Sequence, residues 1–244
     1  MILGSFSRED LLKTFHRIAS VLEDRAHGYY SHNEKSIVNR LRVSGEYKRV
    51  FSCEVDKQRY YEVFNFGLAR KDEVGINRMS ILTVFNDVKG QFVIIHNPNP
   101  CYSDDMYISS SWELRLFTAH FVERFYERTG RDGTGCSLID KTIFILSKMQ
   151  NLCASTVDDT VIRRYGEPAL RFRFLQEGVK ETECTYINDG DVAIVERYGL
   201  VPVWRTYISK EMLFDSQIEF VDKPEIQEGI QMAKSISAKL NGEC

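Results

Sequence analysis

Histidine and arginine recur every four residues in one short segment, at His120, Arg124 and Arg128. In an α-helix, positions four apart lie about 40° apart around the axis, so a helix places these three side chains in one row. An imidazole transfers protons near neutral pH, and neighbouring cations lower its pKa and favour the neutral, basic form. Guanidinium groups bind phosphate oxygens and stabilise charge that develops on them. Because RNA carries its own 2′-OH beside each phosphate, such a row contains the groups needed to cleave RNA without a metal ion.

The same segment also supports two other interpretations. Glu123 and Glu127 share it with the arginines, so the row could be an ordinary solvated face whose charges pair with one another. His120, Glu123 and Glu127 could alternatively converge on one cation. The interleaved arginines oppose a metal ion there, and an HxxE pattern by itself is a weak signal, so no metal is predicted.

The residues around the row predict a strand that leads into a capped helix. Ser109–Phe117 is expected to be a strand, and Thr118 can serve as the N-cap of a helix that continues to Arg128. Thr129-Gly130 then ends the helix. Phe121 and Phe125 give this helix an apolar side that faces the core, which leaves the row of His120 and the two arginines on another side.

The remaining elements follow from hydrophobic periodicity and turn chemistry. The expected helices cover Ser7 to about Arg25, Asn33–Leu41, Leu138–Met149, Val157–Tyr165, a turn at Lys210–Phe214 and a final helix that opens at Asp222 and Pro224. The expected strands are Tyr47–Val55, Arg59–Phe66, Ile81–Phe85, Gln91–His96, Ala169–Leu175, Glu181–Ile187, Val192–Arg197 and Val201–Ile208. The first four strands form two hairpins, and the last four form an antiparallel meander.

Segregated strands joined by tight turns indicate an α+β fold, with an antiparallel sheet of hairpins and a meander and with helices packed on one side. A chain of 244 residues lies near the upper limit for one hydrophobic core. We therefore expect a single α+β domain over 1–244. Residues 1–105, with a helical pair and hairpins, and residues 106–244, with a helix and the meander, are candidate lobes within it.

The spacing His120-x-x-x-Arg124-x-x-x-Arg128, placed after a strand and before a helix and a meander, resembles the RelE/ParE-like toxin-type ribonucleases. The resemblance covers roughly Ser109–Phe214. It implies metal-independent cleavage of RNA by basic and histidine residues. It also implies that Arg205 and Tyr207, at the end of the last strand, complete the pocket. Members of that family are usually short and strongly basic, whereas this chain is long and slightly acidic.

The overall charge restricts the partners that the chain can bind. The formal net charge is −3 and the isoelectric point is near 6.0, so contact with RNA needs a local basic patch. The one local cluster that stands out in the sequence is Arg163, Arg164, Arg171 and Arg173. Neither a GxGxxG motif nor a P-loop occurs, and we expect no cofactor.

The compartment is inferred from the cysteines and from hydropathy. Six cysteines are scattered without a CxxC pair, which fits free thiols in a reducing cytoplasm. No apolar run approaches the roughly 20 residues that cross a bilayer, and no secretory signal opens the chain, so no membrane partner is expected.

A non-catalytic protein–protein interaction module is the alternative to a ribonuclease. Its motivation is the near-neutral charge together with the aromatic hairpin residues Tyr60, Tyr61, Phe64 and Phe66, which could hold a partner protein. The sequence does not decide whether the protein is an enzyme.

Overall fold

The computed structural model describes residues 7–70, 73–87, 90–97, 114–130, 133–148, 155–156, 180–188, 191–198 and 201–215, with isolated positions from 218 to 231. In chain order its elements are α1 (Arg8–Ser44), β1 (Glu46–Val55), β2 (Gln58–Arg70), β3 (Glu73–Asp87), β4 (Gly90–His96), β5 (Leu114–Thr118), α2 (Ala119–Arg128), α3 (Leu138–Lys148), β6 (Ser155–Thr156), β7 (Lys180–Asn188), β8 (Asp191–Tyr198), β9 (Val201–Ile208) and the short 3-10 helix η4 (Lys210–Met212).

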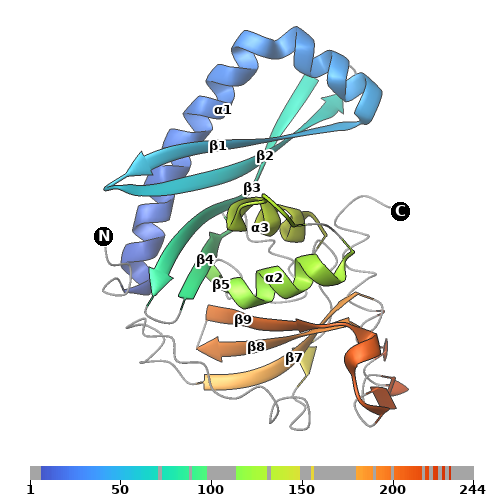
Figure 1. The fold of residues 1–244 in the computed structure, drawn as a ribbon. Helices are drawn as coiled ribbons and strands as arrows, with labels where there is room; N and C mark the ends of the chain where they lie inside the picture. The colour runs from blue at the N-terminus through green and yellow to red at the C-terminus, as the bar shows by residue number, and fades with distance from the viewer. Residues whose placement is uncertain are drawn as a thin grey trace.

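The nine strands form one continuous sheet in the order β1-β2-β3-β4-β5-β9-β8-β7-β6 (Figure 1). Every pairing is antiparallel except that of β5 with β9, which run parallel with Leu116 opposite Val203 and Phe117 opposite Trp204. The predicted α+β class with a mostly antiparallel sheet is therefore confirmed. The β5–β9 pairing joins the N-terminal hairpins to the C-terminal meander.

The two predicted hairpins and the meander are present. At the β1–β2 turn, Asp56 and Lys57 both adopt positive φ, of 51° and 64°, as a two-residue turn between twisted strands requires. β3 pairs with β4 from Ile81 opposite His96 to Asp87 opposite Gly90. β7, β8 and β9 pair in sequence as expected, while the predicted helix at 157–165 and the strand at 169–175 lie outside the described residues.

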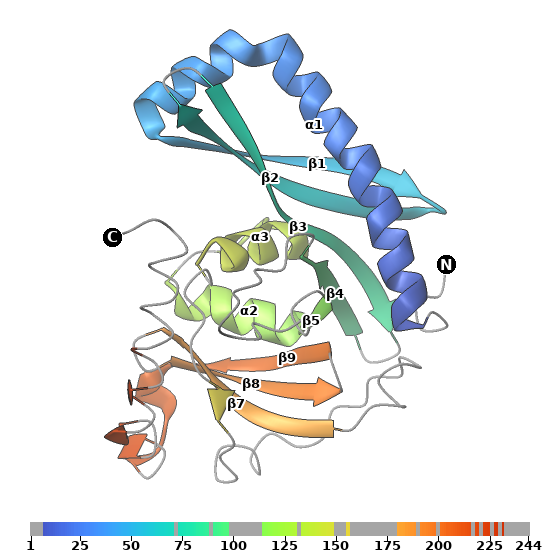
Figure 2. The same cartoon turned by 180° about the vertical axis from the view of Figure 1, so that it is seen from behind.

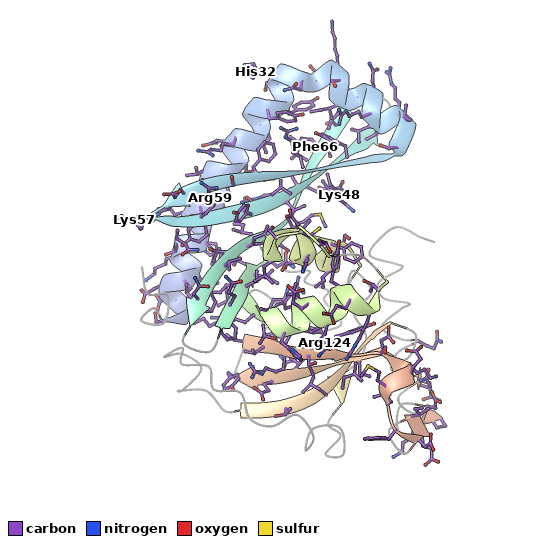
Figure 3. The ribbon with its side chains drawn as sticks, in the orientation of Figure 1. His32, Lys48, Lys57, Arg59, Phe66 and Arg124 are labelled. Carbon is purple, nitrogen blue, oxygen red and sulfur yellow. The ribbon has the colours of Figure 1, made fainter. Side chains whose placement is uncertain are left out.

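The first two predicted helices are one helix of 37 residues, which corrects the expected break near His27-Gly28. Ser7 caps it as predicted, in a capping box with Asp10. α1 bends near His32 (Figures 1 and 3). Around the bend, side chains of Ser31, His32 and Asn33 bond to carbonyl oxygens four residues earlier. Such back-bonding is often associated with helix bending and leaves the helix continuous.

The helices cover both faces of the sheet, rather than the single side that was expected. Alternate residues of the central strands enter two separate cores. Phe64, Ile94 and Leu116 pack under α1, whereas Val93 and Phe117 pack against α2 and α3. Figures 1 and 2 show α1 and the α2–α3 pair on opposite sides of the strands. The central strands are apolar at consecutive positions because both of their faces are buried.

Candidate functional site

The row of His120, Arg124 and Arg128 lies on α2, as predicted. The Thr118 hydroxyl caps the helix by accepting the Phe121 N–H at 3.0 Å. The same hydroxyl donates to the backbone carbonyl oxygens of Arg205, at 2.9 Å, and of Trp204, at 3.1 Å. One side chain therefore fixes the start of α2 against β9.

The apolar face of α2 packs on β9 and sets the direction of the row. The ring centroids of Phe121 and Trp204 are 5.5 Å apart, and those of Phe125 and Tyr207 are 4.8 Å apart. With this face buried, His120 and Arg124 are exposed, and Arg128 is half-buried beside the end of β9 (Figure 3 labels Arg124).

Three guanidinium groups lie within electrostatic reach of the His120 imidazole. Partial burial and the charges of Arg124, Arg128 and Arg205 lower the pKa of His120, and the carboxylate of Glu127 opposes them. The imidazole is therefore held in its neutral, proton-accepting form around pH 7. The effect of the Arg205 charge on His120 is consistent with the predicted proximity of Arg205 to the helical row.

Arg124 and Arg128 have different attachments. The exposed Arg124 guanidinium lies 3.2 Å from the Glu127 carboxylate, in a solvent-accessible pair of the kind that contributes little to stability and exchanges readily. The Arg128 guanidinium donates to the backbone carbonyl oxygen of Tyr207 and lies 6.0 Å from the centroid of that ring. Arg124 is the more exposed of the two cations, and Arg128 is anchored to β9.

Arg205 lies where the register of β8 and β9 shifts, since Ile194 pairs with Thr206 and Val195 with Trp204. Its side chain is 25% exposed, and its Nε lies 3.8 Å from the buried Glu196 carboxylate. Burial lowers the pKa of Arg205, and Glu196 opposes that shift. Arg205 therefore contributes charge to the site from a partly buried, partly neutralised position.

Tyr207 lies beneath the surface and does not reach solvent. It is buried, and its hydroxyl donates to the carboxylate of Asp191, which also accepts the Lys210 N–H at 3.0 Å. Burial and this hydrogen bond raise the pKa of the phenol. The structure thus gives Tyr207 a supporting position under Phe125 and Arg128, in contrast to the expected place in an open pocket.

The alternative cation site is not formed. Glu123 accepts a hydrogen bond from Lys141 at 2.6 Å, and Glu127 pairs with Arg124. In the part of the chain that the structure describes, no three His, Cys, Asp or Glu side chains gather as metal ligands. The acidic residues of α2 instead pair with neighbouring cations.

The aromatic residues that motivated the interaction module belong to the core. Tyr60, Phe64 and Phe66 are each at most 1% exposed under α1, and only Tyr61 reaches the surface in part. They therefore cannot form the binding surface of that hypothesis. The arginine cluster at 163–173 lies outside the described residues.

Sequence reasoning overlooked a second basic cluster, at the corner between α1 and β1. There the Arg40 guanidinium lies over the Tyr47 ring. The Arg49 guanidinium lies over the Tyr29 ring and donates hydrogen bonds to the phenol oxygens of Tyr29 and Tyr47. The signal was present, because residues 35–49 contain five Lys or Arg and a single Glu in a chain of negative net charge.

No protein-family model, curated protein or solved structure matches the chain. The resemblance to RelE/ParE-like ribonucleases thus stays a prediction from the sequence. Among the described residues, no helix combines the length and the apolar character needed to cross a membrane.

Proposed function

We propose that the exposed face of α2 binds RNA and cleaves it without a metal ion. The observation that carries the proposal is the accessible imidazole of His120 within reach of Arg124, Arg128 and Arg205, which favour its neutral form. A neutral imidazole beside several cations combines a proton acceptor with a binding site for a phosphate. The resemblance of the His-Arg-Arg spacing to the toxin-type ribonucleases supports the same chemistry.

In this mechanism His120 accepts the proton of a ribose 2′-OH. The 2′-oxygen attacks the adjacent phosphorus, and the bond to the 5′-oxygen breaks. That oxygen leaves with a proton from solvent, which gives a 2′,3′-cyclic phosphate and a 5′-OH end. Arg124, released from Glu127, binds the non-bridging oxygens, while Arg128 and Arg205 stabilise the charge that develops on them.

The test is turnover of a single-stranded RNA in the presence of EDTA. His120→Ala should lower kcat/KM about 10²-fold or more, as expected for loss of a proton-transfer group. His32→Ala is the matched control, since His32 is also exposed on a helix but lies on α1. Equal cleavage by the His120→Ala variant and the control would contradict the proposal.

A second pair of variants tests phosphate binding by Arg124. Arg124→Gln should weaken kcat/KM about tenfold, since a charge-assisted hydrogen bond is lost. Arg59→Gln removes another exposed arginine in a loose carboxylate pair, at 3.6 Å from Glu54, and should have no effect. The rising limb of the pH profile should lie below pH 6.5, because the pKa of His120 is lowered from that value.

A further inference from the structure

The end of α1 and the start of β1 border an open hollow of about 670 Å³. This volume falls in the range of sites that hold small ligands. The hollow is lined by Ser36, Asn39, Arg40, Val43, Ser44 and Tyr47, and every one of these side chains except that of Val43 carries a hydrogen-bond donor. The hollow lies on the α1 side of the sheet, and His120 lies on the other.

Two guanidinium groups are held in place at this corner by aromatic rings: Arg40 lines the hollow, and Arg49 lies beside it, hydrogen-bonded to the Tyr47 phenol. The Arg40 guanidinium lies 5.2 Å from the ring centroid of Tyr47, and that of Arg49 lies 3.9 Å from the centroid of Tyr29. Arg49 also donates to both phenol oxygens, at 3.0 Å for Tyr29 and 3.1 Å for Tyr47. The rings restrict both guanidiniums before any ligand arrives, which reduces the entropy lost on binding.

These cations have no acidic partner within the described residues. Arg40 and Arg49 contact phenols and rings, and neither forms an ion pair there. The nearby Glu34 instead accepts a hydrogen bond from Tyr30 at 3.1 Å. Arg40 and Arg49 therefore present positive charge that no acidic side chain of the described residues neutralises.

Of the two phenols, Tyr47 responds to these cations, whereas the hydrogen bond to Tyr47 and burial raise the pKa of Tyr29. Burial disfavours ionisation of Tyr47, but the hydrogen bonds from Tyr29 and Arg49 and the charges of Arg49 and Arg40 outweigh it and lower its pKa. The corner thus favours a negatively charged group even on one of its own side chains.

We propose that this corner is a binding site for the phosphate or pyrophosphate group of a small phosphorylated ligand, held by Arg40 and Arg49 with hydroxyl and amide donors of α1. Two guanidiniums fit a group with several negative oxygens better than a single carboxylate, because each can donate to two oxygens. The Tyr47 ring already contacts Arg40 and Phe66, with 5.7 Å between the Tyr47 and Phe66 centroids. Recognition therefore depends on the phosphate rather than on stacking of a base.

Calorimetric titration of the full chain with inorganic pyrophosphate tests the site. Arg40→Gln and Arg49→Gln should each weaken the Kd about tenfold, and the double variant should show no binding. Arg59→Gln, which removes an exposed arginine of β2, should bind like the unmodified protein. All three replaced side chains are exposed, so folding should be preserved. Equal Kd values for Arg40→Gln and Arg59→Gln would overturn the proposal.

Ionisation of Tyr47 gives a readout that does not depend on affinity. Pyrophosphate should raise the pKa of Tyr47 in an ultraviolet titration, and Tyr47→Phe should lose that component of the signal. No change in the titration at saturating pyrophosphate would place the anion elsewhere and reject the site.

Competition experiments distinguish the kinds of molecule that could supply the phosphate group. A nucleoside diphosphate that displaces pyrophosphate from the unmodified protein identifies a soluble phosphate ester. A ten-nucleotide single-stranded RNA that binds through Arg40 while pyrophosphate does not would overturn the small-ligand proposal. None of these outcomes depends on His120, so this site and the proposed ribonuclease activity can fail separately.

Discussion

Acid should destabilise the fold through His96, the last residue of β4, whose side chain is buried against α1. Its ring is 1% exposed and lies 5.2 Å from the Phe15 ring in a stacked arrangement, and within the described residues neither of its nitrogens has a hydrogen-bond partner. Burial, followed by the charges of His16 and Arg78, lowers its pKa from 6.5 to about 4. The folded protein therefore accepts this proton only below about pH 4, whereas the unfolded chain accepts it near pH 6.5.

The size of the effect follows from linkage. A shift from 6.5 to about 4 corresponds to about 3 kcal/mol, at about 1.4 kcal/mol per pH unit. Because the unfolded state binds the extra proton, stability falls as the pH decreases through this window, and the loss is complete below about pH 4. At neutral pH the histidine is uncharged in both states, and this term is absent.

Replacement of His96 by Phe isolates the effect. His96→Phe retains the stacking on Phe15 and removes two buried nitrogens without partners, so we expect about 1 kcal/mol of added stability at pH 7. The advantage of the variant should grow by about 3 kcal/mol between pH 7 and pH 4.

Urea denaturation from pH 4 to pH 8 measures this difference directly. Carboxylates also titrate in this range, but they contribute equally to both proteins, so the difference reports His96. His32→Phe, on the exposed face of α1, is the control and should show the pH dependence of the unmodified protein. A constant stability difference between His96→Phe and the unmodified protein across the range would refute the reasoning.

Three further substitutions test a buried ion pair, a buried hydrogen bond and the β1–β2 turn. Arg78→Met should cost about 3–5 kcal/mol of unfolding free energy, because the fully buried Glu62 carboxylate, 2.8 Å from Arg78, loses its partner. Tyr207→Phe should cost about 1–2 kcal/mol, because Asp191 loses the phenol hydrogen bond. Lys57→Gly should stabilise the protein by about 0.5–1 kcal/mol, because glycine adopts the positive φ of 64° without a steric penalty.

Chemical denaturation checks all three values. Arg59→Met, which breaks a surface pair with Glu54, should change stability by less than about 0.5 kcal/mol and is the control for Arg78→Met. Asn86→Gly, at an exposed position in β3, is the control for Lys57→Gly and should destabilise. A Tyr207→Phe variant as stable as the unmodified protein would show that Asp191 finds another donor.

Local chemistry determined much of the secondary structure. The hairpin around Asp56-Lys57, the cap at Thr118 and the strands of the meander follow from turn residues, a capping hydroxyl and period-two patterns, each of which acts within a few residues. These features do not require knowledge of distant contacts. The His-Arg-Arg row on α2 was readable for the same reason, since it depends only on the helical period.

Contacts between distant segments decided the rest. The sequence does not specify that β5 and β9 pair in parallel, which brings Arg205 close to α2, or that Tyr207 is buried against Phe125. The sequence allowed Phe64 and Phe66 to be surface residues, but in the structure α1 covers them. The residues around His96 likewise do not predict that its side chain is buried. Such features depend on which faces of a sheet the helices cover, and that choice is set by packing of the whole chain.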